Sequence, residues 1–240
     1  MRGSRKAIEP SKAKRRFALA AVLGTGLLLS ACVGSESAPR RISHRPAAKP
    51  SPKRAALPPA YRAGSSEYRQ CTVRLASLNA SYTPLPDRSY GGGCSAYGAV
   101  RLLDVGVPLT NAGAMTCPLA ETFAAWARYG VEPAARLILG SPLVRIETMG
   151  TYNCRTVAGS TKLSEHSHSN AVDVAAFVLA DGRRITIEDD WNGNRSSKEF
   201  LRRIRESACK RFRTVLSPDY NAAHYNHLHF DMGGKGNYCR

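Results

Sequence analysis

Five of the six histidines in this chain lie in two short segments of the sequence. The first segment contains His166 and, seven residues later, Asp173; the second contains His227 and His229. Imidazole is a common neutral ligand of zinc, and it is the side chain that titrates nearest to neutral pH. Two histidines, one carboxylate and a position left for water are typical of a catalytic zinc site. The two segments therefore predict a single metal site.

The spacing within each segment predicts how that site is built. His166 and Asp173 do not have the i, i+4 spacing of ligands on one helix, so we expect a loop to carry the histidine and a strand to carry the carboxylate. His227 and His229 are two residues apart, and such side chains lie on one face of a strand. One can bind the metal while the other lies beside the open position. For any single histidine, a surface or core role is the competing interpretation.

The elements that must position these residues alternate between helix and strand patterns. Apolar residues repeat at helical spacing after Pro118, and a capping box of Ser196 and Glu199 predicts the start of a second helix. Asp181 and Gly182 form a hairpin signal, and prolines and glycines predict a loop-rich opening of the domain. We expect an α+β fold, a mainly antiparallel sheet with flanking helices, with strands at 144–149, 172–179, 185–187, 213–216 and 227–232.

Residues 1–31 have the pattern of a secretory signal peptide. Seven basic residues precede an apolar run that is too short for a membrane-spanning helix. The run ends in Leu29-Ser30-Ala31-Cys32, which resembles the bacterial lipobox, where the cysteine is acylated and becomes the new N-terminus. An ordinary cleaved signal is the alternative. Acylation at Cys32 predicts a periplasmic lipoprotein anchored to an envelope membrane, with the outer membrane favoured.

Residues 32–64 are rich in proline, alanine, serine and basic residues, which predicts a disordered tether. The formal charge of the chain is +17, but residues 1–31 and 32–64 each carry +6, so residues 65–240 carry only +5. This distribution argues against nucleic-acid binding. It favours attraction of the tether to an anionic membrane surface or a cell-wall polymer.

The predicted domain, residues 65–240, contains six of the seven cysteines. An even number in an exported chain predicts disulfides, and six cysteines allow fifteen pairings. No C-x2-C spacing of a zinc finger occurs. We expect cysteines that are neighbours in the sequence to pair, as Cys71–Cys94, Cys117–Cys154 and Cys209–Cys239.

The pattern Ser164-x-His166-x-x-Ser169-x-Ala171-x-Asp173 resembles the S-x-H-x-x-G-x-A-x-D signature of the hedgehog/D-Ala-D-Ala-peptidase group of zinc peptidases. The H-x-H element of that group resembles residues 227–229. More narrowly, nearly all of residues 65–240 resembles the bacterial extensin-like C-terminal domain proteins, most closely in segments 152–155, 163–166, 171–177 and 212–224.

The resemblance to the peptidase group implies roles for individual residues. It implies Zn²⁺ bound by His166, Asp173 and His229, with His227 orienting water or stabilising the intermediate. Arg155 matches an arginine that holds a substrate carbonyl or carboxylate, a role that suits its planar guanidinium. A structural ion pair is an equal alternative for Arg155.

Two positions depart from the group. Ser169 replaces a glycine, which requires only that a slightly larger side chain fits. Asn226 stands where these peptidases have an acidic general base, and an amide cannot accept that proton. His224, Glu165 or His227 then supplies the base, or hydrolysis is slow, or the domain binds metal and ligand without turnover.

The sequence therefore leaves three functional hypotheses. The first is a lipid-anchored zinc metallopeptidase, a carboxypeptidase or endopeptidase that acts on peptidoglycan peptides. The second is a non-catalytic, metal-containing module that binds peptidoglycan or another envelope polymer. The third is a structural lipoprotein whose histidines brace the fold, and the retained ligand pattern argues against it. A serine hydrolase is disfavoured because no G-x-S-x-G motif occurs.

Overall fold

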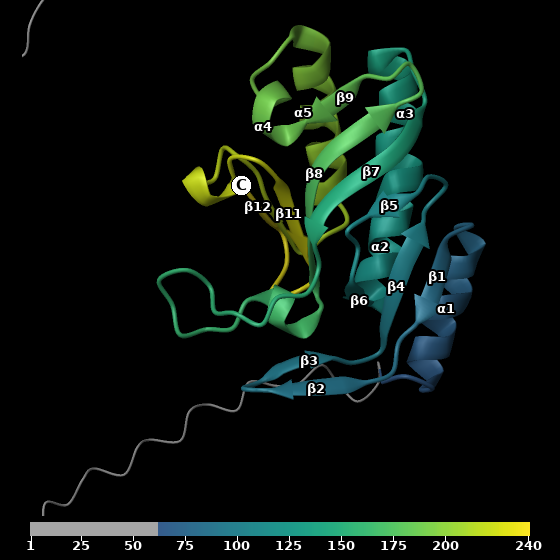
Figure 1. The fold of residues 1–240 in the computed structure, drawn as a ribbon, viewed down its shortest axis with the longest axis vertical. Helices are drawn as coiled ribbons and strands as arrows, with labels where there is room; N and C mark the ends of the chain where they lie inside the picture. The colour runs from purple at the N-terminus through teal and green to yellow at the C-terminus, as the bar shows by residue number, and fades with distance from the viewer. Residues whose placement is uncertain (1–61) are drawn as a thin grey trace, which may run out of the picture. The chain divides into compact units, whose positions relative to one another are not determined.

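The computed structural model describes residues 62–240 (Figure 1). The predicted signal peptide, Cys32 and all but the end of the predicted tether lie outside these residues. No described helix is long and apolar enough to cross a membrane. The helical elements are α1 (Ser66–Ser77), α2 (Cys117–Trp126), η2 (Ala127–Val131), α3 (Glu132–Ala134), η3 (Ala135–Leu139), η4 (Glu165–His168), α4 (Ile187–Asp190), α5 (Arg195–Cys209) and η5 (Ala222–His224).

The main sheet has seven strands, in the order β12-β10-β11-β8-β7-β5, with β9 pairing with β8. Its strands are β5 (Leu109–Thr110), β7 (Leu143–Gly150), β8 (Ala171–Leu179), β9 (Arg184–Thr186), β10 (Thr214–Leu216), β11 (Leu228–Asp231) and β12 (Tyr238–Cys239). The five strands predicted from the sequence correspond to β7, β8, β9, β10 and β11. The mixed α+β class is confirmed.

The prediction of a mainly antiparallel sheet is wrong, because the sheet is mixed. β5 pairs with β7 in parallel at one side, and β12 pairs with β10 in parallel at the other. Both pairs follow from the connections. A long helical stretch separates β5 from β7, and β11 returns the chain before β12 joins the far side of β10.

The opening of the domain is not the loop-rich segment that its prolines and glycines predict. It contains α1 and two small sheets, formed by β1 (Ser81–Pro84), β4 (Ala99–Asp104) and β6 (Ala114–Thr116), and by β2 (Arg88–Gly91) and β3 (Cys94–Ala96). The strands of the second sheet are short and most of β2 is exposed, so no long apolar alternation marks them in the sequence.

The helical stretch from α2 to η3 is continuous, although the sequence predicts a helix only as far as Tyr129. Gly130 and Pro133 would normally end a helix. Here two π-helical segments accommodate the change in hydrogen bonding, and Pro133 occupies the first turn of α3, where its missing N–H costs little. Gly130 faces α5, where a Cβ would lie 2.3 Å from Ser207 Oγ. Gly140, with φ 68°, ends the stretch.

The core lies between this helical stretch, α5 and the main sheet. Trp126 is its centre: the ring is fully buried, and its indole N–H donates to the Ile204 carbonyl of α5 at 2.9 Å. Asn194, not Ser196, caps α5, because its side chain accepts from the Ser197 N–H, so the predicted capping box is wrong. Aromatic rings surround Trp126 at centroid distances of 4.9–6.4 Å, from Phe123, Phe177, Phe212 and Phe230.

The six domain cysteines form three disulfides, but two of the predicted pairings are wrong. The bonds are Cys71–Cys117, Cys94–Cys154 and Cys209–Cys239, and only the last was predicted. Neighbours in sequence are not neighbours in space here. Cys71 lies on α1, which packs against α2 with its Cys117, while β3 places Cys94 beside the loop that follows β7.

Candidate metal centre

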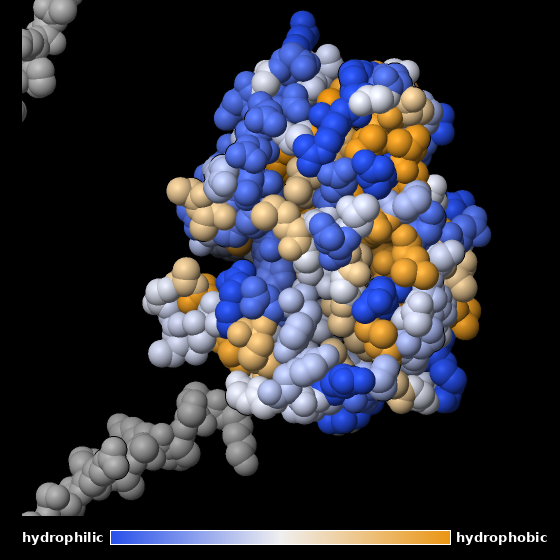
Figure 2. Space-filling model, in the orientation of Figure 1, coloured by the Kyte–Doolittle hydropathy of each residue, from blue (hydrophilic) through white to orange (hydrophobic). Residues whose placement is uncertain are grey.

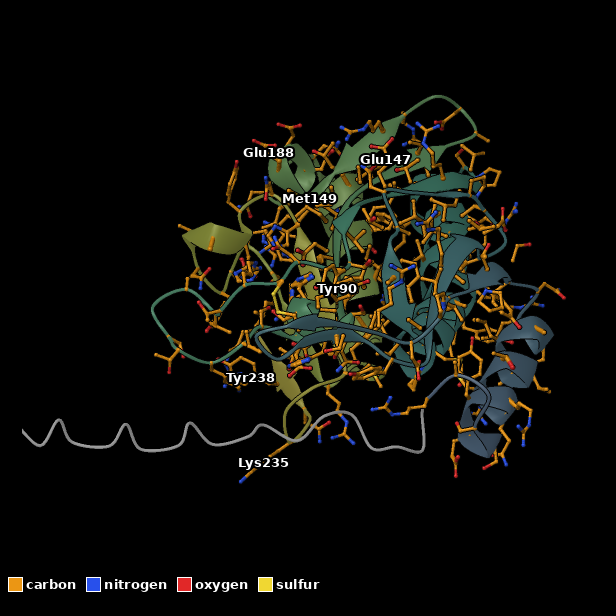
Figure 3. All side chains as sticks on the ribbon, turned by 60° about the horizontal axis from the view of Figure 1, so that its bottom comes forward. Tyr90, Glu147, Met149, Glu188, Lys235 and Tyr238 are labelled. Atoms are coloured by element: carbon orange, nitrogen blue, oxygen red, sulfur yellow. A yellow bond between two sulfur atoms is a disulfide. The ribbon has the colours of Figure 1, made fainter. Side chains whose placement is uncertain are left out.

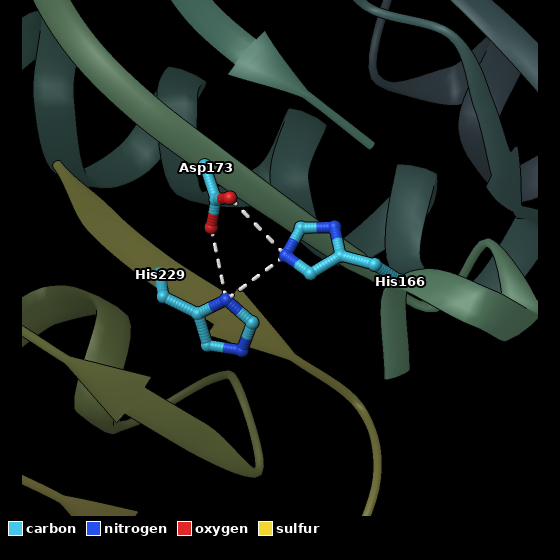
Figure 4. Close-up of side chains that lie close together, drawn as sticks. All are labelled: His166, Asp173 and His229. Carbon is cyan, nitrogen blue, oxygen red and sulfur yellow. Dashed lines mark hydrogen bonds and ion pairs between the residues drawn. The ribbon is translucent and has the colours of Figure 1, made fainter. Parts of the chain in front are cut away.

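His166, Asp173 and His229 lie together in the folded chain, and one ligand atom of each lies within 4.8 Å of the others (Figure 4). His166 Nε2 is 3.2 Å from Asp173 Oδ2, and His229 Nδ1 is 2.9 Å from Asp173 Oδ1. The two nitrogens are 3.2 Å apart. Both histidines are buried. The structure thus brings together the three residues that the sequence predicted as ligands.

Strand register places Asp173 opposite His229. The two residues are direct partners in the antiparallel pair β8·β11. On β8, Val172 and Val174 point into the core, so Asp173 between them points to the other face of the sheet. Leu228 and Phe230 on β11 are part of the same core cluster. The apolar alternation that folds the sheet therefore fixes where the carboxylate and the imidazole meet.

A short 3-10 helix, η4, brings in the third residue. Ser164 is its N-cap, with the hydroxyl 3.4 Å from the His166 N–H. Ser169 ends it in the left-handed region, at φ 54°, where glycine is normally preferred. This conformation gives a physical reason for the glycine that stands at this position in the peptidase signature that the sequence resembles. It also turns the chain directly into β8, which puts His166 and Asp173 side by side despite their separation in sequence.

Each imidazole is oriented by a partner on its outer nitrogen. His166 Nδ1 lies 3.1 Å from the Thr151 carbonyl, and His229 Nε2 lies 3.1 Å from Asp231 Oδ2. Since these oxygens accept, each outer nitrogen carries a hydrogen, and the two facing nitrogens are the atoms that can give a lone pair to a metal ion when it replaces a proton between them. Backbone carbonyls and carboxylates are the usual partners that fix a metal-binding histidine in this way.

The donor set fits a zinc ion. Imidazole and carboxylate ligands surround zinc at about 2.0–2.2 Å in a tetrahedron, which puts neighbouring ligand atoms about 3.3 Å apart. The two facing nitrogens are 3.2 Å apart, close to that spacing, and each lies 2.9–3.2 Å from a different oxygen of Asp173. With one oxygen of Asp173 taken as the ligand, the three atoms lie within 4.8 Å of one another. Two lone pairs and a carboxylate that converge in a buried place repel one another unless a cation, a proton or a metal ion, lies between them.

The electrostatics of the cluster favour positive charge. Burial alone would lower the pKa of His229, but its hydrogen bonds to Asp173 and Asp231 raise the pKa to about 9. Burial would likewise raise the pKa of Asp173, but the hydrogen bonds from His166 and His229 hold it well below its usual range. The carboxylate of Asp173 is therefore ionised and available to a cation at neutral pH.

The other predicted site residues lie beside the cluster. His227 Nε2 is 3.7 Å from Asp173 Oδ1, and His227 Nδ1 is 3.0 Å from Asn226 Oδ1. The ring of His224 is 5.1 Å from that of His227, and its Nδ1 contacts Asn221 Oδ1 at 2.7 Å. Burial lowers the pKa of His224 to about 4, and burial also lowers that of His227 although Asp173 opposes it.

Arg155 is exposed beside these histidines, and its positive charge contributes to lowering the pKa of both His224 and His227. Ser167 of η4 holds its backbone: the Ser167 hydroxyl is 2.6 Å from the Arg155 carbonyl and accepts from the Arg155 N–H at 3.0 Å. Among residues 62–240 the guanidinium has no carboxylate partner, so the structural ion pair considered from the sequence is not present.

The contacts of Glu165 argue against its acting as the general base. Its carboxylate accepts from the Asn170 side-chain amide at 2.9 Å, and it packs so closely on Gly233 that a Cβ there would lie 2.2 Å from it. Of the three residues considered as bases in place of Asn226, this leaves the two histidines. Figure 2 shows a notch at the left edge of the molecule, and in Figure 1 the loop after β7 lies below this place and the segment before β11 lies above it.

Sequence reasoning missed Asp231 and Thr151. A signal for Asp231 was present, since it follows His229 by two residues on a predicted strand and therefore shares its face. No signal marks Thr151, because it acts through its backbone carbonyl, and any residue type supplies that group.

The chain is thus a disulfide-linked α+β domain with a buried His/Asp cluster on one face of its main sheet. The model of the family described as extensin-like protein C-terminus matches residues 69–240, and the chain belongs to this family. The narrower resemblance stated from the sequence is thereby confirmed. No curated protein and no solved structure matches the chain.

Proposed function

We propose that this protein is a zinc-dependent peptidase of the cell envelope that acts on peptidoglycan peptides. One observation carries the proposal: ligand atoms of His166, Asp173 and His229 converge within 4.8 Å of one another, and the outer nitrogen of each of the two histidines already has a partner. The likeness of segment 164–173 and of the H-x-H element to the hedgehog/D-Ala-D-Ala-peptidase group supports the reaction class.

Zinc bound by these three residues would polarise a scissile carbonyl and lower the pKa of a bound water. The chain's own residues provide the rest. Arg155, exposed and without a carboxylate partner, can hold a carbonyl or carboxylate of the peptide next to the histidines. The Asp231 carboxylate keeps the His229 ring turned toward the cluster.

His227 is the residue we assign to proton transfer. The Asn226 amide oxygen can only accept, so it fixes the hydrogen of His227 on Nδ1 and leaves Nε2 with a lone pair toward the cluster. Catalytic bases are commonly held in the correct tautomer by a neighbouring hydrogen-bond acceptor in this way. Asn226 thus acts as a positioning residue. Although the acidic base of the related peptidases is absent, His227 remains as a proton acceptor.

A non-catalytic binding module is the second candidate function, and Asn226 is the residue that favours it. In the related peptidases the acid at the position of Asn226 accepts the proton of the attacking water, and here that group is an amide. General-base assistance typically contributes about 10²–10⁴ in rate. A site without it can hold metal and a peptide carboxylate with little turnover.

Metal analysis and peptide cleavage separate the two candidates. We expect one zinc per chain in the wild type and none after substitution of His166, Asp173 or His229 by alanine. His168→Ala is the matched control, since this histidine lies on η4 but outside the cluster. Cleavage of cross-linked muropeptides by the wild type supports the peptidase. Stoichiometric zinc without cleavage supports the binding module, and full cleavage without bound metal contradicts both.

We propose in addition that the chain is a lipoprotein of the periplasm, anchored through Cys32. The lipobox-like run supports this, and the basic residues 32–64 would add attraction to an anionic membrane surface. Cys32→Ser should release the protein from the membrane fraction or block its processing. Unchanged fractionation and processing of that variant would contradict the anchor.

A further inference from the structure

A groove of about 480 Å³ lies next to the metal centre but outside it. Gly150 and Thr151 form part of its wall, and both also belong to the centre. Gly150 is the strand partner of Asp173, and the Thr151 carbonyl orients His166. A ligand in the groove would therefore lie one chain segment away from the three metal-binding side chains.

The groove is positively charged. Arg88 of β2 and Arg101 of β4 line it, and no acidic residue does. Both side chains are exposed, and neither guanidinium has a hydrogen-bond or ion-pair partner within residues 62–240. Elsewhere in the domain arginines commonly pair with a carboxylate, as Arg74 does with Glu121 and Arg145 with Glu147. Two unpaired arginines in one groove make a binding place for a carboxylate, because the planar guanidinium matches its geometry.

Two tyrosines form an aromatic part of the same groove. Tyr90 and Tyr152 stand with ring centroids 4.8 Å apart, tilted by 40°. Tyr90 is 49 % exposed, so its ring is accessible to a ligand although it contacts Tyr152. In Figure 3 it lies on β2, on the face turned to the viewer, with Met149 of β7 further along that face. Exposed rings beside charged groups are typical of ligand sites.

A disulfide joins the groove to the metal centre. Cys94 on β3 is bonded to Cys154, which stands between Tyr152 of the groove and Arg155 of the centre. The hairpin β2–β3, which carries Arg88 and Tyr90, is therefore covalently held beside the segment that reaches the histidines. Such preorganisation reduces the entropy that binding would otherwise cost.

We propose that this groove binds a carboxylate-bearing part of the stem peptide of peptidoglycan, with Arg88 and Arg101 holding the carboxylate and Tyr90 and Tyr152 contacting the apolar part of the neighbouring residue. The proposal rests on the proposed function for the identity of the substrate. It adds a specificity site, which selects peptides with free carboxylates over peptides in which these groups are amidated.

The test is a pair of titrations on the full chain. One probe is a synthetic stem peptide with free carboxylates, N-methylated at its C-terminal peptide bonds to prevent cleavage; the other is the same peptide with its carboxylates amidated. We expect tighter binding of the first. Arg88→Gln and Arg101→Gln should each weaken its binding by about tenfold, the low end for a charge-assisted hydrogen bond, and should remove the preference over the amide.

Matched controls separate the groove from general effects. Arg203→Gln changes an equally exposed arginine on α5 and should bind both peptides as the wild type does. Tyr90→Phe should keep the affinity and Tyr90→Ala should lose it, since the ring and not the hydroxyl makes the contact. Thermal unfolding of each variant checks that it is folded.

The outcomes for the groove and for the proposed function are distinct. Equal affinity for the two peptides, or wild-type affinity in both arginine variants, overturns the groove proposal. If the wild type nevertheless binds zinc and cleaves muropeptides, the proposed peptidase function holds and only the groove proposal is wrong. If the wild type binds neither peptide and cleaves nothing although it holds zinc, both the groove and the substrate class are wrong.

Discussion

Asp231 Oδ2 lies 3.1 Å from His229 Nε2, on the side of the ring that faces away from Asp173. The other oxygen of Asp231 accepts from the Gly233 N–H at 2.8 Å, so the carboxylate is itself held in place. The His229 ring is therefore fixed between two carboxylates. One of them belongs to the proposed ligand set, and the other determines which nitrogen points to it.

This contact predicts a specific effect on metal affinity. Asp231→Asn keeps the shape of the side chain but removes the charge that orients and polarises His229. Loss of such a partner typically lowers metal affinity by about 10–100-fold. Zinc affinity measured against a competing chelator should fall within this range, with the fold retained.

Asp104→Asn is a matched control for that experiment. Asp104 also accepts from the N–H of a glycine two residues further along, at 2.7 Å from Gly106, but it is the last residue of β4 and lies outside the His/Asp cluster. Its substitution should leave zinc affinity unchanged. An equal loss in both variants would mean that the effect comes from the turn, not from the contact with His229.

A second prediction concerns His227 and Asn226. His227→Ala should leave zinc bound, because this residue is outside the ligand set, but should lower muropeptide cleavage by about 10²–10⁴-fold. Asn226→Ala should also lower cleavage, since nothing then holds the hydrogen of His227 on Nδ1. Asn226→Asp should instead keep the cleavage rate of the wild type, because a carboxylate accepts the same hydrogen from His227. Wild-type turnover in Asn226→Ala would contradict the positioning role.

His224→Ala tests the competing base. His224 Nδ1 contacts Asn221 Oδ1, whereas His227 Nε2 lies 3.7 Å from Asp173 Oδ1, and among residues 62–240 His224 has no such contact with Asp173. We expect a smaller loss of cleavage than in His227→Ala. A larger loss would assign the base to His224 and leave His227 to orient the substrate.

The His/Asp cluster was predictable from the sequence because two of its residues lie on predicted strands and the third lies in the motif that resembles the peptidase signature. β11 alternates apolar and polar residues, and Asp173 is the one polar residue of the apolar strand β8. The resemblance to the peptidase signature supplied His166. Nothing in that reasoning requires knowledge of the whole fold. The local pattern is sufficient where a strand is half buried.

The rest of the domain depends on contacts that local patterns do not contain. The disulfide partners were mispredicted because packing of α1 on α2 and of β3 on the loop after β7, not distance along the chain, decides which cysteines meet. The helix after Pro118 extends beyond Gly130 because Gly130 faces Ser207, a partner far away in sequence. The groove was not predicted because four separate segments form it.

The Cys94–Cys154 bond gives a prediction about stability. Replacing both cysteines by serine should lower the free energy of unfolding by about 2–5 kcal/mol, since the bond closes a segment of 60 residues. It should also weaken stem-peptide binding, because the hairpin that carries Tyr90 is no longer tied to the metal centre. Denaturant unfolding and peptide titration measure the two effects.

The Cys209–Cys239 bond provides the comparison, because it closes only 30 residues and ties the C-terminus to α5, outside the groove. Its removal should cost a similar or slightly smaller free energy, as the entropy of loop closure changes slowly with length. Peptide affinity should be unaffected. Equal loss of affinity in both double variants would contradict a specific link between the Cys94–Cys154 bond and the groove.

The last prediction concerns acid stability and Glu147 on β7, a strand that β8 separates from β11. Arg184 Nε is 2.9 Å from its Oε2 and Arg145 is 3.0 Å from its Oε1. Burial would raise the pKa of Glu147, but the hydrogen bonds and charges of Arg184 and Arg145 outweigh it, so the pKa lies below its ordinary value of 4.5. A carboxyl whose pKa is lowered by folding stabilises the protein above its unfolded pKa, and this contribution is lost as the pH falls through the folded pKa.

We therefore expect the free energy of unfolding of the wild type to fall more steeply below about pH 4.5 than that of Glu147→Gln, because the amide has no charge to lose. Urea unfolding at a series of pH values measures both slopes. Glu188→Gln is the control: this carboxyl is exposed on α4, and Figure 3 labels it together with Glu147. Its slope should equal that of the wild type. Parallel slopes for wild type and Glu147→Gln would show that the two arginines do not stabilise the folded chain through Glu147.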